Sequence, residues 1–181
     1  MSRGLHTSQL RLPAFTYFAM RHQYRVTKYD PGLRGIGGAF ARDEWTSYSD
    51  VGRSCGGVAL SASEYLRVEN AYLLSVEEFL SEAGVETLQL RASENKAGSA
   101  LPKFVRPLAP LTIPQCVEFA RIALREIAWG KLASPARAYV HFGWDFYMYI
   151  GLPKKCPNAI AAAQSRGLFV ENFRSPYLRA R

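Results

Sequence analysis

The stretch YVHFGWDFYMYIG, residues 139–151, decides the architecture that we predict for this chain. It is the densest aromatic segment, because six of its thirteen residues are Tyr, Phe or Trp. The period of two that a β-strand requires divides it into two strands, residues 137–142 and 145–151, which turn tightly at Gly143 and Trp144. The side chains that then point into a hydrophobic core are those of Val140, Phe142, Phe146, Met148 and Ile150.

The opposite face of this predicted hairpin is polar and aromatic. A row of exposed aromatic rings can stack on nucleic-acid bases or anchor a protein partner, and His141 and Asp145 would lie close across the turn. Alternatively, another layer of the protein covers this face and its hydroxyl groups find buried partners. The sequence leaves both interpretations open. The candidate binding residues of the hairpin are Tyr139, His141, Trp144, Asp145, Tyr147 and Tyr149.

Two segments show the 3.6-residue period of an amphipathic helix. The first begins with a capping box formed by Ser61 and Glu64, and Gly84 supplies its left-handed end. Its apolar face comprises Tyr65, Val68, Tyr72, Val76, Phe79 and Ala83. A second capping box opens at Thr112, and we expect that helix to end near Gly130. Its apolar stripe comprises Val117, Ala120, Leu124 and Ala128.

The remaining segments complete an α+β pattern. Residues 22–30, 85–92 and 168–173 have the composition of strands, and a short helix runs from Pro157 to Gly167. The order of elements predicts a mostly antiparallel sheet of about four to five strands. Two main helices and a short C-terminal helix pack on one side of that sheet. We expect residues 20–181 to form a single domain.

Residues 1–19 are basic and contain no Asp or Glu, so their composition resembles that of an organelle transit peptide. Pro13 and scattered polar residues interrupt any long amphipathic helix there. A start at Met20, with the preceding residues a translated extension or a loose arm, is the simpler interpretation. We therefore predict that residues 1–19 lie outside the fold.

The composition excludes several classes of protein. Apolar residues make up 48% of the chain, which is enough for a core, but no apolar run reaches the roughly 18–20 residues that span a bilayer. The net charge of +8 permits an acidic partner, yet no Lys/Arg-rich run stands out, and we interpret the surplus as solvated surface rather than a nucleic-acid groove. Cys55, Cys116 and Cys156 lack metal-ligand spacing, so we expect free thiols and reducing, cytoplasmic surroundings.

An irregular segment at residues 39–57, AFARDEWTSYSDVGRSCGG, is the nearest thing to a carboxylate cluster. Paired carboxylates can act as acid and base or hold a divalent cation. Asp43 and Glu44 are adjacent and would point to opposite faces of an extended chain, so one of them would pair with Asp50. The alternative is that these carboxylates cap turns or pair with Arg42 and Arg53. The candidate binding residues here are Arg42, Asp43, Glu44, Trp45 and Asp50.

Motifs of well-known enzymes are absent from the sequence. GIGG at residues 35–38 is glycine-rich, but it lacks the strand and the helix that flank a phosphate-binding loop, and we interpret it as a flexible turn. No G-x-S-x-G motif occurs. We therefore assign no catalytic residue, no metal ligand and no cofactor.

Several long motifs resemble a family of small, uncharacterised bacterial proteins. They are YRVTKYDP at residues 24–31, RDEWTSYSDVG at 42–52, EYLRVENAY at 64–72, YVHFGWDFYMYIG at 139–151 and CPNAIAAAQSRGLFVENFRSPY at 156–177. The resemblance covers nearly all of residues 20–177 and implies a bacterial origin. No established activity accompanies it, so it implies no catalytic residue.

We expect a non-enzymatic α+β binding protein of the bacterial cytoplasm, of an immunity or accessory type that acts on a protein partner. The alternative is an RNA- or DNA-binding protein that uses basic surface and exposed aromatic side chains. A third hypothesis is a small enzyme that uses Asp43, Asp50 and His141. That hypothesis requires the three side chains to converge in one pocket, because acid–base catalysis needs hydrogen-bond reach to a shared substrate.

Overall fold

The computed structural model describes residues 20–38, 40–95, 98, 100–134, 137–143 and 145–178. The helices in this part of the chain are α1 (Ala62–Ala83), α2 (Ile113–Leu124) and α3 (Pro157–Ser165). The strands are β1 (His22–Thr27), β2 (Ser54–Cys55), β3 (Val58–Ala59), β4 (Thr87–Asn95), β5 (Pro110–Thr112), β6 (Ala128–Ser134), β7 (Ala138–Phe142), β8 (Met148–Leu152) and β9 (Phe169–Asn172).

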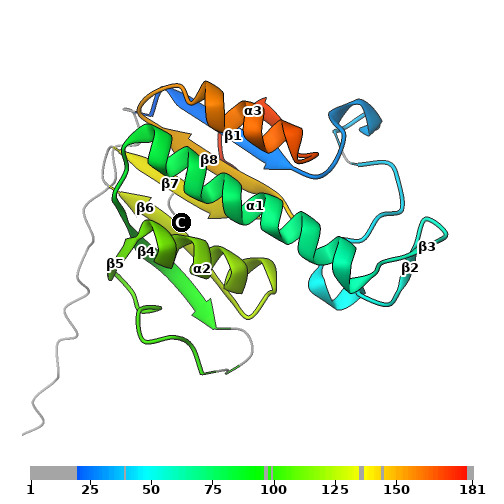
Figure 1. Cartoon of the computed structure of the whole chain (residues 1–181), viewed down its shortest axis with the longest axis horizontal. Coiled ribbons are helices and arrows are strands. Elements are labelled where there is room, and N and C mark those ends of the chain that lie inside the picture. Colours follow the sequence, from blue (N-terminus) through cyan, green and yellow to red (C-terminus); the bar gives the residue numbers. More distant parts are fainter. Residues whose placement is uncertain are drawn as a thin grey trace, which may run out of the picture.

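Seven of the described strands form one sheet in the order β5-β4-β6-β7-β8-β1-β9, and every neighbouring pair is antiparallel. The three helices cover one face of this sheet, with α1 between α2 and α3 (Figure 1). Strands β2 and β3 form a separate small hairpin. The predicted α+β class and the mostly antiparallel sheet are confirmed. The sheet has more strands than the four to five that were predicted.

Helix α1 matches the sequence prediction closely. The Ser61 hydroxyl accepts a hydrogen bond from the Glu64 amide at 3.1 Å, which caps the N-terminus. Gly84 ends the helix with φ 71°, a left-handed conformation that favours glycine. All six residues of the predicted apolar face are buried. This helix therefore forms the centre of the core.

Helix α2 is shorter than predicted, because it ends at Leu124 rather than near Gly130. Glu126 has φ 58°, which breaks the helix, and Ala128 belongs to β6. Ala128 lies four residues after Leu124 and so continues the period of the helical stripe, which explains the error. A Cβ atom at Gly130 would lie 2.8 Å from Phe119, so glycine lets α2 approach the sheet.

Strand β5 was also missed, because Pro110 argues against a strand. It is tolerated here because β5 is the edge strand of the sheet, where one side of the backbone needs no partner. The predicted strands at residues 22–30, 85–92 and 168–173 correspond to β1, β4 and β9. The predicted short C-terminal helix is α3, which is followed by Gly167 at φ 85°.

The hairpin of the opening motif forms β7 and β8, and its predicted inward side chains are all buried. Its turn is longer than predicted, because the Gly143 amide donates to the Tyr147 carbonyl at 2.7 Å and Asp145 and Phe146 adopt positive φ. Gly151 faces the ring of Tyr139, and a Cβ atom there would lie 2.0 Å from Tyr139 Cε1. Trp144 and residues 1–19 fall outside the described residues, as does the prediction made for that N-terminal segment.

No described helix is both long enough and apolar enough to cross a membrane. The three cysteines are free thiols, of which Cys116 and Cys156 are buried. Burial raises the pKa of the Cys116 thiol to about 12, so this sulfur stays protonated and unreactive.

Candidate functional site

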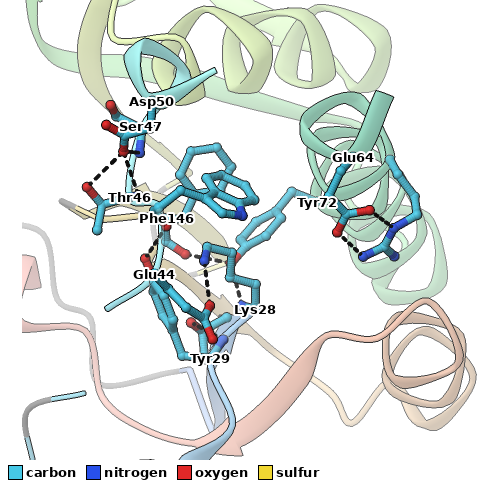
Figure 2. Close-up of polar contacts among 12 residues, drawn as sticks. Lys28, Tyr29, Glu44, Thr46, Ser47, Asp50, Glu64, Tyr72 and Phe146 are labelled. Atoms are coloured by element: carbon cyan, nitrogen blue, oxygen red, sulfur yellow. Dashed lines mark hydrogen bonds and ion pairs between the residues drawn. The ribbon is translucent and has the colours of Figure 1, made fainter. Parts of the chain in front are cut away.

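The irregular segment 40–57 is fastened to the sheet by a nearly buried lysine. Lys28 follows β1, and its Nζ lies 2.9 Å from Glu44 Oε2 (Figure 2). The same Nζ lies 4.1 Å from the ring centroids of Tyr29 and Trp45, so it makes two cation–π contacts. The Lys28 side chain is only 6% exposed. Burial lowers the pKa of Lys28, and the Glu44 carboxylate opposes that shift.

Aromatic packing extends this anchor into the core. The Trp45 ring packs against Phe146 at 5.0 Å, in an edge-on geometry. The Tyr72 hydroxyl of α1 donates to the Phe146 carbonyl at 2.6 Å and accepts from the Lys28 amide at 2.7 Å (Figure 2). This single hydroxyl group thereby joins α1, the end of β1 and the β7–β8 turn. Segment 40–57 is thus held against the core at Trp45.

The two aspartates of the segment build turns. Asp50 Oδ2 accepts hydrogen bonds from the amides of Thr46 and Ser47, at 2.9 and 3.1 Å (Figure 2). These backbone bonds, the Thr46 one first, lower the pKa of Asp50. Asp43 Oδ2 accepts from the Gly56 amide at 2.8 Å and so ties the segment to the β2–β3 hairpin. Both carboxylates therefore act as the turn-capping alternative describes.

The residues of the enzyme hypothesis do not share a contact. Among the residues that the structure describes, no hydrogen bond or ion pair joins Asp43, Asp50 and His141. Nor does the described part of the chain contain a group of three or more His, Cys, Asp or Glu side chains that could hold a metal ion. Asp43 is bonded to Gly56, Asp50 to Thr46 and Ser47, and His141 to Ser175.

The end of the molecule that contains segment 40–57 also carries the two most exposed aliphatic side chains among the described residues. Ile36 is 106% exposed and Val58 is 73% exposed, and each stands beside a pair of glycines with positive φ. Tyr48 is also exposed, and Arg42 lies at the surface near it in sequence. Residues 31–38 and the β2–β3 hairpin both extend from one end of the molecule, at the right of Figure 1. We call residues 31–59 the loop end.

The polar face of the β7–β8 hairpin is covered by the chain itself. Tyr139, His141 and Tyr149 are buried, and the C-terminal residues 173–178 pack over them. His141 Nδ1 lies 2.9 Å from Ser175 Oγ, and the Tyr177 amide donates to the same oxygen at 3.2 Å. We call residues 173–178 the C-terminal strap.

The environment keeps the His141 ring neutral. The ring is fully buried and stacks on Tyr139 with centroids 4.4 Å apart. The hydrogen bond between His141 Nδ1 and Ser175 Oγ holds the ring against the strap. Burial, and then the positive charge of Lys131, lower the pKa of His141 to about 3.

Three candidate residues of this face lie inside the protein. Tyr139, His141 and Tyr149 contact another layer of the protein, as the second interpretation stated. Tyr147 is half-buried beside Tyr29, at a centroid distance of 5.5 Å, and Asp145 is exposed in the turn. His141 binds Ser175 and not Asp145.

Sequence reasoning missed the basic and aromatic side chains around the strap. Glu171 of β9 is clamped by Arg25 at 3.0 and 3.1 Å and by Arg34 at 2.7 and 2.6 Å. Trp129 of β6 was hidden by the helix predicted to end near Gly130, and Lys131 was left in the connection that follows it. Residues 128–132, which alternate between buried and half-buried positions, carried the signal for a strand.

The chain matches no protein-family model, no curated protein sequence and no solved structure.

Proposed function

We propose that this protein is a non-enzymatic binding protein that holds a protein partner through its loop end. The observation that carries the proposal is the exposure of Ile36 beside Gly37 and of Val58 at the start of β3, both at one end of the molecule. Binding residues are concentrated on loops that a rigid scaffold positions. An immunity or accessory role that blocks such a partner belongs to this proposal.

The base of the loop end supports a preorganised surface. Lys28, Glu44 and Trp45 fix the segment to β1, while Asp43 fixes the β2–β3 hairpin to that segment. A loop that is ordered before binding loses less conformational entropy on association. Most carboxylates of the segment are therefore used to hold the loops, which leaves the aliphatic tips and Tyr48 for contact with the partner.

Site-specific photo-crosslinking tests the proposal. Benzoylphenylalanine is placed at Ile36, at Val58 or, as a control, at Leu74, which is 42% exposed on the outer face of α1. In cells that produce the protein, both loop-end positions are expected to give the same discrete crosslinked product, whereas Leu74 gives none. Mass spectrometry of that product identifies the partner.

The purified partner then allows a quantitative test. Full burial of an isoleucine side chain contributes about 1.5–3 kcal/mol, so Ile36→Ser is expected to weaken binding by about tenfold or more. Leu74→Ser is expected to leave the affinity unchanged. Crosslinks of equal yield at all three positions, or an unchanged affinity of Ile36→Ser with an unchanged melting temperature, would refute the assignment.

A further inference from the structure

The two edges of the seven-stranded sheet end in different ways. At one edge, the residues of β5 whose backbone groups point away from β4 are Pro110 and Thr112. Proline has no amide hydrogen, and the Thr112 amide donates to Gln115 Oε1 at 3.0 Å. Features of this kind keep an edge strand from pairing with another chain.

At the opposite edge, β9 leaves its outward backbone groups free. The Phe173 amide donates to the Gln23 carbonyl at 2.9 Å. Because bonded and non-bonded pairs alternate along an antiparallel ladder, the amides and carbonyls of Val170 and Asn172 point away from β1. No residue in the described part of the chain donates to these carbonyls or accepts from these amides. This edge is therefore a template for one more strand.

The composition of β9 does not protect this edge. The strand contains no proline and no lysine, which commonly block the addition of a strand. Its only charged residue is Glu171, whose carboxylate is held by the guanidinium groups of Arg25 and Arg34. The negative charge of Glu171 is thus fully compensated, and it does not repel an acidic chain.

The charge beside the edge is positive. Two arginines on one carboxylate leave an excess of one positive charge at Glu171, and exposed Arg174 follows two residues after the strand. A second copy of the chain would bring the same positive edge and a net charge of +8, so self-pairing is opposed. An acidic segment of another protein would be attracted.

The side chains of β9 favour a segment that alternates in character. On the helix side of the sheet, half-buried Val170 packs against the core, so an aliphatic side chain beside it would be partly covered. On the other side lie Glu171 with its two arginines and exposed Phe173. Opposite residues of neighbouring strands place their Cβ atoms about 4.5–5.5 Å apart. Acidic side chains on that second face would therefore come close to the arginines.

We propose that the edge of β9 binds an extended acidic segment of a partner protein, which adds one strand to the sheet. In this mode of recognition, main-chain hydrogen bonds supply affinity and alternate side chains supply specificity. The proposal uses neither Ile36 nor Val58, so it goes beyond the function proposed for the loop end and does not depend on it.

Fluorescence anisotropy with a labelled synthetic peptide of about seven alternating valine and glutamate residues tests the proposal. The wild-type protein is expected to bind this peptide at least about tenfold more tightly than the matching valine–lysine peptide, because lysine would meet the positive charge. Asn172→Pro removes one outward amide and is expected to weaken binding by about fivefold. The control Asn172→Ala keeps that amide and is expected to bind as the wild type does.

The fold is expected to tolerate the proline, because the Asn172 amide makes no hydrogen bond to β1. Melting temperatures of the variants verify this. A second measurement leaves the protein unchanged: methylation of alternate amide nitrogens removes every donor from one edge of the peptide. One of the two methylation registers is expected to abolish binding and the other to retain it, because an added strand pairs through one edge only.

Four results would overturn the proposal. The first is the absence of valine–glutamate peptide binding up to about 1 mM. The second is an equal effect of Asn172→Pro and Asn172→Ala. The third is a dimer in light scattering that Asn172→Pro abolishes, which would assign the edge to a second copy of the chain. The fourth is loss of peptide binding in Ile36→Ser, which would place the peptide at the loop end.

Discussion

Acidification between pH 7 and 5 is expected to destabilise the fold through His141. The ring is fully buried, is hydrogen-bonded to Ser175 and lies near the positive charge of Lys131. Protonation would place a second positive charge in this buried environment. The pKa of His141 is therefore lowered to about 3 in the folded protein, against about 6.5 in the unfolded chain.

The sign and size of the effect follow from linkage. Because the folded pKa is the lower one, the unfolded state takes up a proton first as the pH falls below about 6.5, and stability is lost progressively until about pH 3. Protonation of His141 stabilises the unfolded state by the equivalent of about 1.5 pK units at pH 5, compared with about 0.1 at pH 7. The difference is about 2 kcal/mol, equivalent to roughly 4–8 °C in melting temperature.

Urea denaturation followed by circular dichroism at pH 7, 6 and 5 measures this loss. The matched control is His141→Asn, whose side-chain amide can still form a hydrogen bond with Ser175 but does not titrate. The wild-type protein is expected to lose about 2 kcal/mol more than the variant between pH 7 and 5. Parallel pH dependences of the two proteins would show that His141 can be protonated at little cost, and the argument from burial would fail.

Two further substitutions test the packing of the core. Glu69 is fully buried and accepts hydrogen bonds from Arg125 at 2.7 and 2.8 Å. Glu69→Gln is therefore expected to lower the free energy of unfolding in urea by about 3 kcal/mol. The control Glu64→Gln, at an exposed pair with Arg67, is expected to cost less than about 1 kcal/mol. Equal effects of the two changes would contradict the assigned role of burial. Gly151→Ala would drive a methyl group into the Tyr139 ring, and the expected loss in the free energy of unfolding in the same assay is about 3 kcal/mol. A loss below about 0.5 kcal/mol would mean that β7 and β8 do not pack as closely as the structure shows.

The parts of the fold that depend on local patterns could be predicted from the sequence. The N-cap hydroxyl of Ser61 and the left-handed Gly84 define α1 because both signals act within a few residues of the helix ends. The alternation in residues 139–151 places Val140 and Ile150 in the core because the pleat of a strand fixes side-chain direction.

The parts that depend on distant partners could not be predicted. Strand β6 resembles the end of a helix in sequence, and only its position between β4 and β7 makes it a strand. The burial of His141 depends on Ser175, which is 34 residues away in the chain. Sequence periodicity identified the polar face of the hairpin but carried no information about the strap that covers it.

The distribution of roles among the candidate residues follows from the same distinction. Aromatic and acidic side chains attract attention in a sequence, yet Trp45, Asp50 and Tyr139 are used here to hold loops and layers together. The accessible aliphatic side chains of the loop end follow or precede pairs of glycines, with Ile36 before Gly37 and Val58 after Gly57 at the start of β3. A turn of this kind has no structural need for an aliphatic tip, because alanine or serine there would avoid exposing apolar surface to water. The cost of exposing Ile36 is therefore best offset by a partner that covers it, which is why the loop end is the surface where the protein-binding proposal has to be tested first.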